Sequence, residues 1–277
     1  MSVASISKPL PRRVQQARDY LIDLWERREF VLALALGNFR ARNASTALGL
    51  FWWVLNPLLL GAVYFFVVIA LFGRQSPDFL TYLLSGMFVF HFTGQALTSG
   101  ANSIIQNSRL LSNLRFPRVI LPLSRLIEST MGFIASLGVF CFIAAVSGQA
   151  NFTYRLIYLP AILAIHFVFN LGLSALAARL AVPFRDINNV IPYLNRIWLY
   201  TSPILWQVST LPNLSELARR IVEFNPLFSI IGVYRSALLG APFIGSMIVT
   251  MITWAVVVGV LGLFLFIKYE GRMVRYL

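Results

Sequence analysis

The chain has 277 residues, of which 58% are hydrophobic and only 12% are charged. Because an ordinary soluble domain carries about 25% charged residues, this composition excludes a water-soluble enzyme and indicates a membrane protein. The net charge of +13 does not indicate nucleic-acid binding, since the basic residues lie in short segments between long apolar runs rather than in one patch on a soluble face.

Residues 11–42 precede the first long apolar run and predict a helix at the membrane surface. Val14, Ala17, Leu21 and Leu24 recur at helical spacing, and arginines occupy polar positions between them. A helix with one apolar and one basic face lies in the plane of the membrane interface. The alternative is a leader helix that is only solvated.

Six apolar stretches follow, and each is long enough to cross a bilayer, which takes about 20 residues in a helix. They predict an all-α membrane protein with six transmembrane helices. In chain order the stretches cover residues 47–73, 79–100, 119–147, 155–179, 190–208 and 243–267.

A polar segment at residues 101–118 separates the second and third spans and predicts a short cytoplasmic helix. Ile105, Leu110 and Leu111 belong to an apolar stripe at helical intervals. That stripe either docks on a partner or packs on the membrane surface. The helix ends before the third span, because Pro117 disfavours helix at the residue before it.

Residues 209–241 form a predicted outer loop, and a structureless loop of that length is uncommon. The part at residues 226–239 is apolar but too short to span a bilayer, which is typical of a re-entrant or interfacial segment. We expect one or two short helices that fold back into the outer leaflet.

The distribution of basic residues predicts the orientation, because cytoplasmic loops of membrane proteins are rich in Lys and Arg. With both termini in the cytoplasm, 16 of the 23 basic residues fall on the cytoplasmic side and five on the outer side. The other two, Arg125 and Arg196, lie inside spans. We therefore expect both termini to be cytoplasmic.

No repeat or linker divides the chain, so we expect a single domain over residues 1–277. It comprises a cytoplasmic N-terminus with the interface helix at residues 1–42, a six-span membrane domain at residues 43–267, and a cytoplasmic tail at residues 268–277.

The sequence carries no signature of catalysis or of nucleotide binding. It lacks a G-x-x-x-x-G-K-[ST] phosphate loop, so the chain is not expected to hydrolyse ATP. His91 and His166 lie in different spans without neighbouring ligands, so hydrogen-bonded packing is a simpler role for them than metal binding. We predict no catalytic residue and no metal site.

Two charged features lie inside spans, where charges are costly and often functional. Arg125 and Glu128 are three residues apart and can pair on one face of the third span. They also lie near the predicted cytoplasmic interface, where such a pair is less costly. The sequence therefore agrees equally well with a functional role and with a purely structural one. Arg196 is expected to face protein or water rather than lipid.

The order of these features resembles the ABC-transporter permeases that export polysaccharides such as O-antigen, capsule and teichoic acid. Six strings in the matching order carry the resemblance. They are "ALGLFWWVLNPLL", "YLLSGMFVFHF", "NSRLLSNLRFPRVILPL", "FRDINNVIPYL", "SPILW" and "FNPLFSIIGVYRSALLG".

The resemblance implies an assembly in the bacterial inner membrane rather than a protein that acts alone. Two copies of the chain would form a homodimer around a channel, with two copies of a separate ATPase subunit that holds ATP and Mg. No cofactor would be bound by this chain itself. The cargo would be a lipid-linked polysaccharide, O-antigen-like or cell-wall galactan-like, moved outward from the cytoplasmic face.

The resemblance also implies roles for individual residues. Aromatic side chains, whose ring faces can pack on sugars, would line the channel: Trp52, Trp53, Tyr64, Phe88, Phe92, Tyr193, Trp198 and Tyr200. Two cytoplasmic segments would couple to the ATPase: Asn102, Ile105, Arg109, Leu110 and Leu111, and then Phe184, Arg185 and Asp186. The outer loop would gate the exit through Pro226, Tyr234 and Arg235.

Three other functions are weighed against polysaccharide export. A permease for a small drug or lipid would share the fold, but the aromatic spans and the re-entrant loop favour a polymer. An intramembrane glycosyl- or acyltransferase would need acidic or histidine catalysts facing one compartment, and here these residues are scattered. A passive channel would not require a docking helix.

Overall fold

The computed structural model describes residues 12–42, 44–73, 78–114, 116–148, 154–206, 215–242 and 245–273. Across these residues the chain is helical and contains no strand, which confirms the predicted all-α class for the described part of the chain. Predictions that concern residues 1–11, 207–214 and 274–277 lie outside the described residues. These include the start of the outer loop and the last four residues of the cytoplasmic tail.

The helices follow one another closely along the chain. Two short 3₁₀ turns, Gly49–Phe51 and Tyr154–Tyr158, lead into α3 and α7. The α-helices are α1 (Arg12–Glu26), α2 (Arg28–Ala41), α3 (Trp52–Phe72), α4 (Phe79–Gln106), α5 (Ser108–Asn113), α6 (Ile120–Val146), α7 (Leu159–Ala181), α8 (Ile187–Thr201), α9 (Glu216–Phe224), α10 (Pro226–Leu238) and α11 (Gly245–Met273).

Four segments of the described chain are long and apolar enough to cross a membrane, and they match four of the six predicted spans. They are Gly49–Leu71, Ile120–Val146, Tyr154–Ala181 and Gly245–Gly271. Helix α4 has the length, but polar residues such as His91 and Gln95 interrupt its apolar sequence, and α8 has only 15 residues. The multi-pass prediction is thus confirmed, while the count of six crossings stays a prediction.

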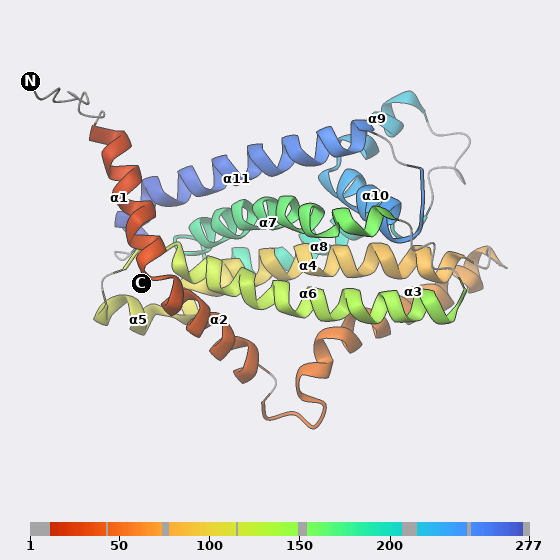
Figure 1. The fold of residues 1–277 in the computed structure, drawn as a ribbon, viewed down its shortest axis with the longest axis horizontal. Helices are drawn as coiled ribbons and strands as arrows, with labels where there is room; N and C mark the ends of the chain where they lie inside the picture. Colours follow the sequence, from red (N-terminus) through yellow and green to blue (C-terminus); the bar gives the residue numbers. More distant parts are fainter. Residues whose placement is uncertain are drawn as a thin grey trace, which may run out of the picture.

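The long helices form a bundle in which α4, α6, α7 and α11 run side by side (Figure 1). Helices α1 and α5 lie at one end of this bundle, called here the α5 end, and α9 and α10 lie at the other, the α10 end (Figure 1). The predicted cytoplasmic and outer features therefore gather at opposite ends.

Helices α7 and α11 approach so closely that glycine is required between them. A Cβ atom on Gly172 would collide with the backbone of Val258, and one on Gly262 would collide with the backbone of Gly172. Small residues at such crossings let helix backbones pack closely within a membrane. This contact joins the last span to the centre of the bundle.

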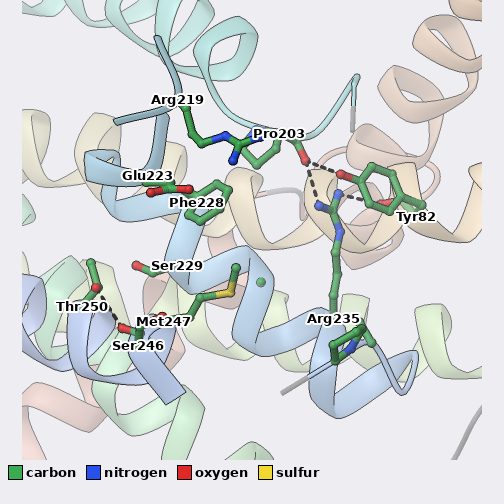
Figure 2. Close-up of a pocket in the computed structure, with 13 residues that line it drawn as sticks. Tyr82, Pro203, Arg219, Glu223, Phe228, Ser229, Arg235, Ser246, Met247 and Thr250 are labelled. Atoms are coloured by element: carbon green, nitrogen blue, oxygen red, sulfur yellow. Dashed lines mark hydrogen bonds between the residues drawn. The ribbon is translucent and has the colours of Figure 1, made fainter. Parts of the chain in front are cut away.

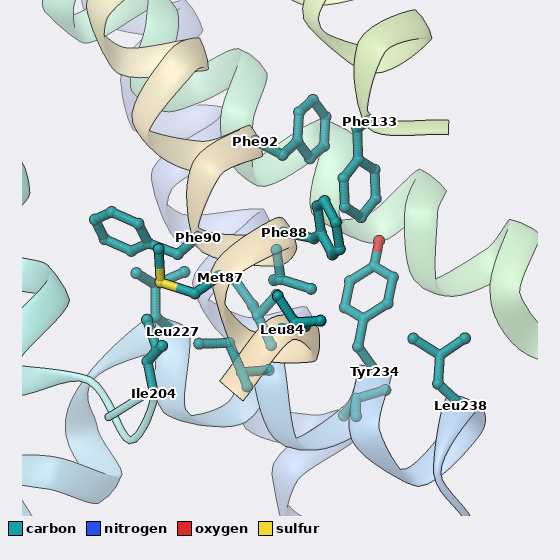
Figure 3. Close-up of a cluster of buried hydrophobic side chains, with 14 of the residues drawn as sticks. Leu84, Met87, Phe88, Phe90, Phe92, Phe133, Ile204, Leu227, Tyr234 and Leu238 are labelled. Atoms are coloured by element: carbon teal, nitrogen blue, oxygen red, sulfur yellow. The ribbon is translucent and has the colours of Figure 1, made fainter. Parts of the chain in front are cut away.

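Aromatic rings fill the core between α4, α6, α7 and α10 (Figure 3). Phe92 of α4 stacks on Phe133 of α6 with ring centroids 4.7 Å apart, and Phe88 meets Phe140 at 6.2 Å. Tyr234 of α10 points into the same cluster, with its ring 5.7 Å from that of Phe133. The outer-loop helix α10 is thus anchored in the core.

Two predicted elements differ from the structure. The single interface helix expected over residues 11–42 is two helices, because Val31 and Ala35 of α2 are buried and α2 packs on α6 whereas α1 does not. The short helix expected over residues 101–118 is divided. Its first six residues continue α4 as far as Gln106, because Ala101 and Ile104 are buried, and only Ser108–Asn113 form the separate helix α5.

Candidate functional site

Helix α8 carries a row of exposed polar and aromatic side chains along one face. Asn189, Tyr193, Arg196 and Tyr200 recur at spacings of three or four residues and are all exposed, Tyr193 at 64% and Tyr200 at 54%. The Arg196 guanidinium lies 5.9 Å from the centroid of the Tyr193 ring. An arginine exposed to lipid in the middle of a membrane helix is costly, so this face is suited to water or to another protein surface.

The tyrosine row continues from α8 onto α3. The hydroxyl oxygens of Tyr64 and Tyr200 lie 3.4 Å apart, and the two rings meet edge to face with centroids 6.2 Å apart. The structure therefore brings together three of the aromatic residues that the sequence analysis assigned to a channel: Tyr64, Tyr193 and Tyr200.

Other members of that predicted aromatic set do not join the row. Trp53, Phe88 and Phe92 are buried inside a single chain, because their rings fill the core or its edge, so they do not lie on this exposed row. Trp198 is partly buried and donates a hydrogen bond from Nε1 to Asn225 Oδ1 at 2.9 Å. Trp52 is partly exposed and lines a cavity of about 390 Å³.

A charge network near the α5 end contains the predicted pair Arg125 and Glu128. Arg125 Nη1 lies 3.1 Å from Glu128 Oε2, and Arg42 Nη1 lies 3.2 Å from Glu128 Oε1. The Glu128 side chain is fully buried, so both guanidinium groups compensate one buried carboxylate. Sequence reasoning missed Arg42 here, because it stands 86 residues from Glu128 and no local spacing connects them.

The same arginines are held by amide oxygens of α4. Arg42 Nη2 donates to Gln95 Oε1 at 3.0 Å, and Arg125 Nη2 donates to Gln106 Oε1 at 2.9 Å. Arg42 also lies over the Trp53 ring, 4.5 Å from its centroid. The network borders a cavity of about 440 Å³ between α2, α4 and α6.

The residues predicted to couple to an ATPase lie at the α5 end of the bundle (Figure 1). Asn102 and Ile105 are on the last two turns of α4, and Asn102 Nδ2 donates to Thr98 O at 3.0 Å. Arg109 is exposed on α5 and Leu110 is partly exposed, whereas Leu111 packs against a buried cluster.

The second predicted coupling segment is the turn before α8. Phe184, Arg185 and Asp186 are all exposed there, Phe184 at 63%. Ile187 follows them and packs on the same small cluster as Ile105 of α4. The two predicted coupling segments are therefore neighbours in space.

At the α10 end, Arg235 is buried and ties three elements together (Figure 2). Its Nη1 donates to Pro203 O at 2.8 Å, its Nη2 to Tyr82 O at 3.0 Å, and its Nε to Ser85 Oγ at 3.2 Å. Its guanidinium also lies over the Tyr82 ring, 3.4 Å from the centroid. Because Pro203 is the second residue after α8, Arg235 joins α10 to the end of α8 and to the first turns of α4.

The other two predicted gate residues, Pro226 and Tyr234, help to start α10 and to pack it on the core. Pro226 begins α10, where the Asn225 side chain caps the helix by accepting from Leu227 N at 3.0 Å. Tyr234 is fully buried, and its ring contacts those of Phe133 and His166, so it packs in the core of the chain. Only Arg235 borders the cavity of about 820 Å³ beneath α9 and α10.

Helix α1 is tethered to the bundle by Glu270 near the end of α11. Tyr20 donates from its hydroxyl to Glu270 Oε2 at 2.8 Å, and the backbone N–H of Arg118 donates to Glu270 Oε1 at 2.6 Å. Burial, together with the carboxylate of Glu270, raises the pKa of Tyr20, so the tyrosine stays a neutral donor. Leu21 and Trp25 remain exposed on α1, at 63% and 70%.

Histidine and acidic side chains do not gather into a ligand set among the described residues, where no group of three or more His, Cys, Asp and Glu could hold a metal ion. His166 instead lies 2.8 Å from Thr93 Oγ1 through its Nε2 atom. This agrees with the packing role expected for it.

Comparison with known proteins shows similarity over most of the chain. The profile of the family described as "ABC-2 type transporter" matches residues 29–239, which is more than half of the chain. The O-antigen export system permease protein RfbA of Myxococcus xanthus is 26% identical over 215 residues, 77% of this chain and 82% of that protein. A protein of the same name from Klebsiella pneumoniae is 25% identical over 258 residues, 93% of this chain and 96% of that protein.

Proposed function

The chain belongs to the ABC-2 type transporter family, and from this membership we propose that it is the membrane permease subunit of an ATP-driven polysaccharide exporter. The similar proteins from Myxococcus xanthus and Klebsiella pneumoniae are named as O-antigen export permeases, which supports an O-antigen-like cargo. The alternative within the same family is a permease for a small drug or lipid.

The observation that carries the proposal is the exposed row of tyrosines and Arg196 on α8 and α3. Tyrosine rings offer broad apolar faces with a polar tip, so they can contact successive sugars without holding any one of them tightly. Arg196 indicates that the row faces water rather than hydrocarbon. Such a surface fits the wall of a path for a hydrophilic polymer.

One chain presents this row on its outside, so a closed path requires a second wall. We propose that a second copy supplies it and that the functional unit is a homodimer with α3 and α8 next to the channel. The chain would cross the bacterial inner membrane six times, with both termini in the cytoplasm. Arg235, which links α10 to the end of α8, would then belong to the outer end of the path.

ATP binding is assigned to a separate partner subunit, with two copies per assembly. The exposed Arg109 on α5 and the exposed turn at Phe184, Arg185 and Asp186 provide neighbouring surfaces for it at the α5 end. ATP and Mg would be held by that partner, and this chain would convert its movement into movement of the channel helices.

Depletion of the chain in its host tests the proposal, with lipid-linked glycan measured separately on each face of the inner membrane. We expect glycan to accumulate on the cytoplasmic face and the surface polymer to be lost. Unchanged glycan on both faces would contradict polysaccharide export and favour a small-molecule cargo. If lipid-linked precursor failed to form at all, an enzyme of glycan assembly would fit better.

A further inference from the structure

The cavity of about 820 Å³ at the α10 end has the size of a ligand site, since such sites commonly enclose about 300–1,000 Å³. Its lining comes from α9, from α10 and from the first turns of α11, and it is completed by Tyr82 of α4 and Pro203 after α8 (Figure 2). The proposed transport path uses the tyrosine row on α8 and α3, and it leaves the wall formed by α9 and α11 without a role.

The charged side chains of this cavity are unbalanced. Arg219 and Glu223 of α9 and Arg235 of α10 line it, and the ion pairs among the described residues include none of these three. The three hydrogen bonds of the buried Arg235 all go to uncharged acceptors. Two cations and one anion leave one net positive charge, and a buried charge without a counter-charge is costly. A ligand with one negative charge would balance it.

Most of the uncharged lining is apolar. The apolar residues are Pro203, Phe228, Gly232, Ala241, Pro242 and Met247. Phe228 supplies a broad ring face from α10, and Met247 supplies a flexible, polarizable side chain from α11 that can adapt to an irregular apolar ligand. This part of the cavity is therefore suited to hydrocarbon.

The hydroxyl groups on the lining are poorly suited to a sugar. Ser229 Oγ donates to Pro226 O at 3.0 Å, and Thr250 Oγ1 donates to Ser246 O at 2.9 Å, so neither hydrogen is available to a ligand. No amide side chain lines the cavity within the described part of the chain. A sugar placed here would lose hydrogen bonds to water without replacing most of them, which is costly. The cavity therefore favours a ligand with a charged head and an apolar body.

Helix α9 places this cavity beside a surface that is suited to lipid. Leu217, Ile221 and Phe224 form an exposed apolar row along it, at spacings of three or four residues. Arg219 and Glu223 of the same helix line the cavity. A helix with one apolar and one charged face lies in the membrane interface, with its apolar side chains among the lipids. Lipid molecules are therefore the nearest source of a ligand for the cavity.

The cavity also lies at the depth of lipid headgroups. Helix α11 is one of the segments long and apolar enough to cross a membrane, and at 1.5 Å per residue Ser246 and Thr250 lie about 2 and 8 Å along it from Gly245. The headgroup layer accounts for roughly 5–7 Å on each side of a bilayer. The lining thus extends from the headgroup layer to the edge of the hydrocarbon core.

We propose that this cavity binds an anionic phospholipid from the leaflet at the α10 end. The phosphate lies near the exposed Arg219, the buried Arg235 adds its positive charge from the cavity wall, and the acyl chains lie against Phe228 and Met247. The bound lipid fills the space between α9, α10 and α11 and holds these helices together. The inference rests on the cavity and on α9, and it does not depend on which cargo the protein moves.

Lipid binding to the purified full chain tests this inference, with native mass spectrometry as the readout. Phosphatidylglycerol, which has one negative charge, is compared with zwitterionic phosphatidylcholine of the same acyl chains. We expect phosphatidylglycerol to bind at least about tenfold more tightly, because charge-assisted hydrogen bonds to arginine contribute about that factor or more. Arg219→Gln should weaken its binding by about three- to tenfold, since one partly solvated bond of this kind is lost. Arg220→Gln is the matched control, because Arg220 is exposed on the same helix but does not line the cavity.

A second variant blocks the cavity without removing a charge. Ser246→Trp places a large ring in it from an exposed position at the start of α11, and Val249→Trp, nearby but outside the lining, is its control. Phosphatidylglycerol should raise the midpoint of thermal unfolding of the unmodified chain and of Val249→Trp, because a ligand that binds the folded state stabilises it. This increase should be lost in Ser246→Trp.

Equal binding of the two phospholipids would overturn the site. So would an equal loss of binding in Arg219→Gln and Arg220→Gln, because it would show only a general attraction of anionic lipid to α9. An increase in the midpoint of Ser246→Trp as large as that of its control would overturn it as well. Displacement of phosphatidylglycerol by glucuronate would assign the cavity to an acidic sugar instead. The depletion experiment is independent of these outcomes, so failure of the lipid site leaves the exporter proposal standing, and failure of the exporter proposal leaves the lipid site standing.

Discussion

At the scale of single residues, Arg235 shows how one buried cation can organise the end of a bundle. Its three donors satisfy two backbone carbonyls and one hydroxyl from two other elements. Gly86 leaves room for it, since a Cβ there would lie 2.9 Å from Arg235 Nη2. The residue therefore acts as a link between α10 and the segment that follows α8.

Replacing Arg235 with Gln should loosen that link. The shorter, neutral side chain cannot reach all three acceptors, and each hydrogen bond from a charged group that is lost costs about 1.5–3 kcal/mol. We expect the midpoint of thermal unfolding of the purified protein to fall by at least about 4 °C, at about 2–4 °C per kcal/mol for a chain of this size. Arg219→Gln is the control, because Arg219 borders the same cavity but is exposed. Equal midpoints for the two variants would contradict the linking role.

At the scale of elements, the contact between α7 and α11 depends on an absence of side chains. Gly172→Ala places a methyl group against the Val258 backbone, and overpacking of this kind typically costs about 1–3 kcal/mol. Gly138→Ala on α6 is a matched control, because a Cβ at Gly138 has nothing within 4 Å and alanine favours helix over glycine. We expect thermal unfolding at a lower temperature for Gly172→Ala and at an equal or higher one for Gly138→Ala. The reverse order would show that the two helices do not meet at these glycines.

Helix α5 allows a second test at this scale. Leu111 packs against the buried cluster, so a charge there would disturb folding, whereas the partly exposed Leu110 can be changed with less damage. Leu110→Glu should reduce co-purification of the partner ATPase and block export, because a charge replaces an apolar contact at the docking surface. Leu110→Met should retain both co-purification of the ATPase and export, since methionine conserves the volume and the apolar surface of the side chain. Normal export by Leu110→Glu, with the protein present in the membrane, would rule out docking through this face.

At the scale of the whole molecule, the exposed surface of α8 includes polar side chains, and that of α11 includes large apolar ones. The exposed surface of α8 carries Tyr193 and Arg196 beside apolar residues such as Ile197, whereas the exposed residues Val256 and Val260 of α11 have no such polar neighbours in sequence. A bundle in a membrane turns apolar surface to lipid and polar surface to water or protein. The two faces are therefore expected to have different surroundings.

Cysteine labelling can detect that difference, because Cys141 is the chain's one cysteine and can first be replaced by serine. In opened membranes, Tyr193→Cys should react with a water-soluble maleimide at least tenfold faster than Val260→Cys. The reason is that the thiolate forms, and the reagent is present, only where water reaches. Equal rates would mean that the α8 face is turned to lipid, and the channel proposal would lose its main support.

The sequence by itself determined the features that depend on neighbouring residues. Apolar runs longer than about 20 residues have few stable environments outside a membrane, so the all-α class and the multi-pass character followed directly. The pairing of Arg125 with Glu128 followed from their helical spacing. One or two short helices in the outer loop also followed, because the apolar run at residues 226–239 is too short to span a bilayer, and α9 and α10 lie there.

Only the tertiary structure decided which side of each helix is covered. Phe92 and Tyr193 are both aromatic residues in predicted spans, yet one stacks in the core and the other is 64% exposed. Arg42 joins Glu128 across 86 residues, and Arg235 reaches Tyr82 O across 153. Local periodicity predicts that a helix forms and which residues share one of its faces. The element that covers this face is set by the long-range packing of whole helices.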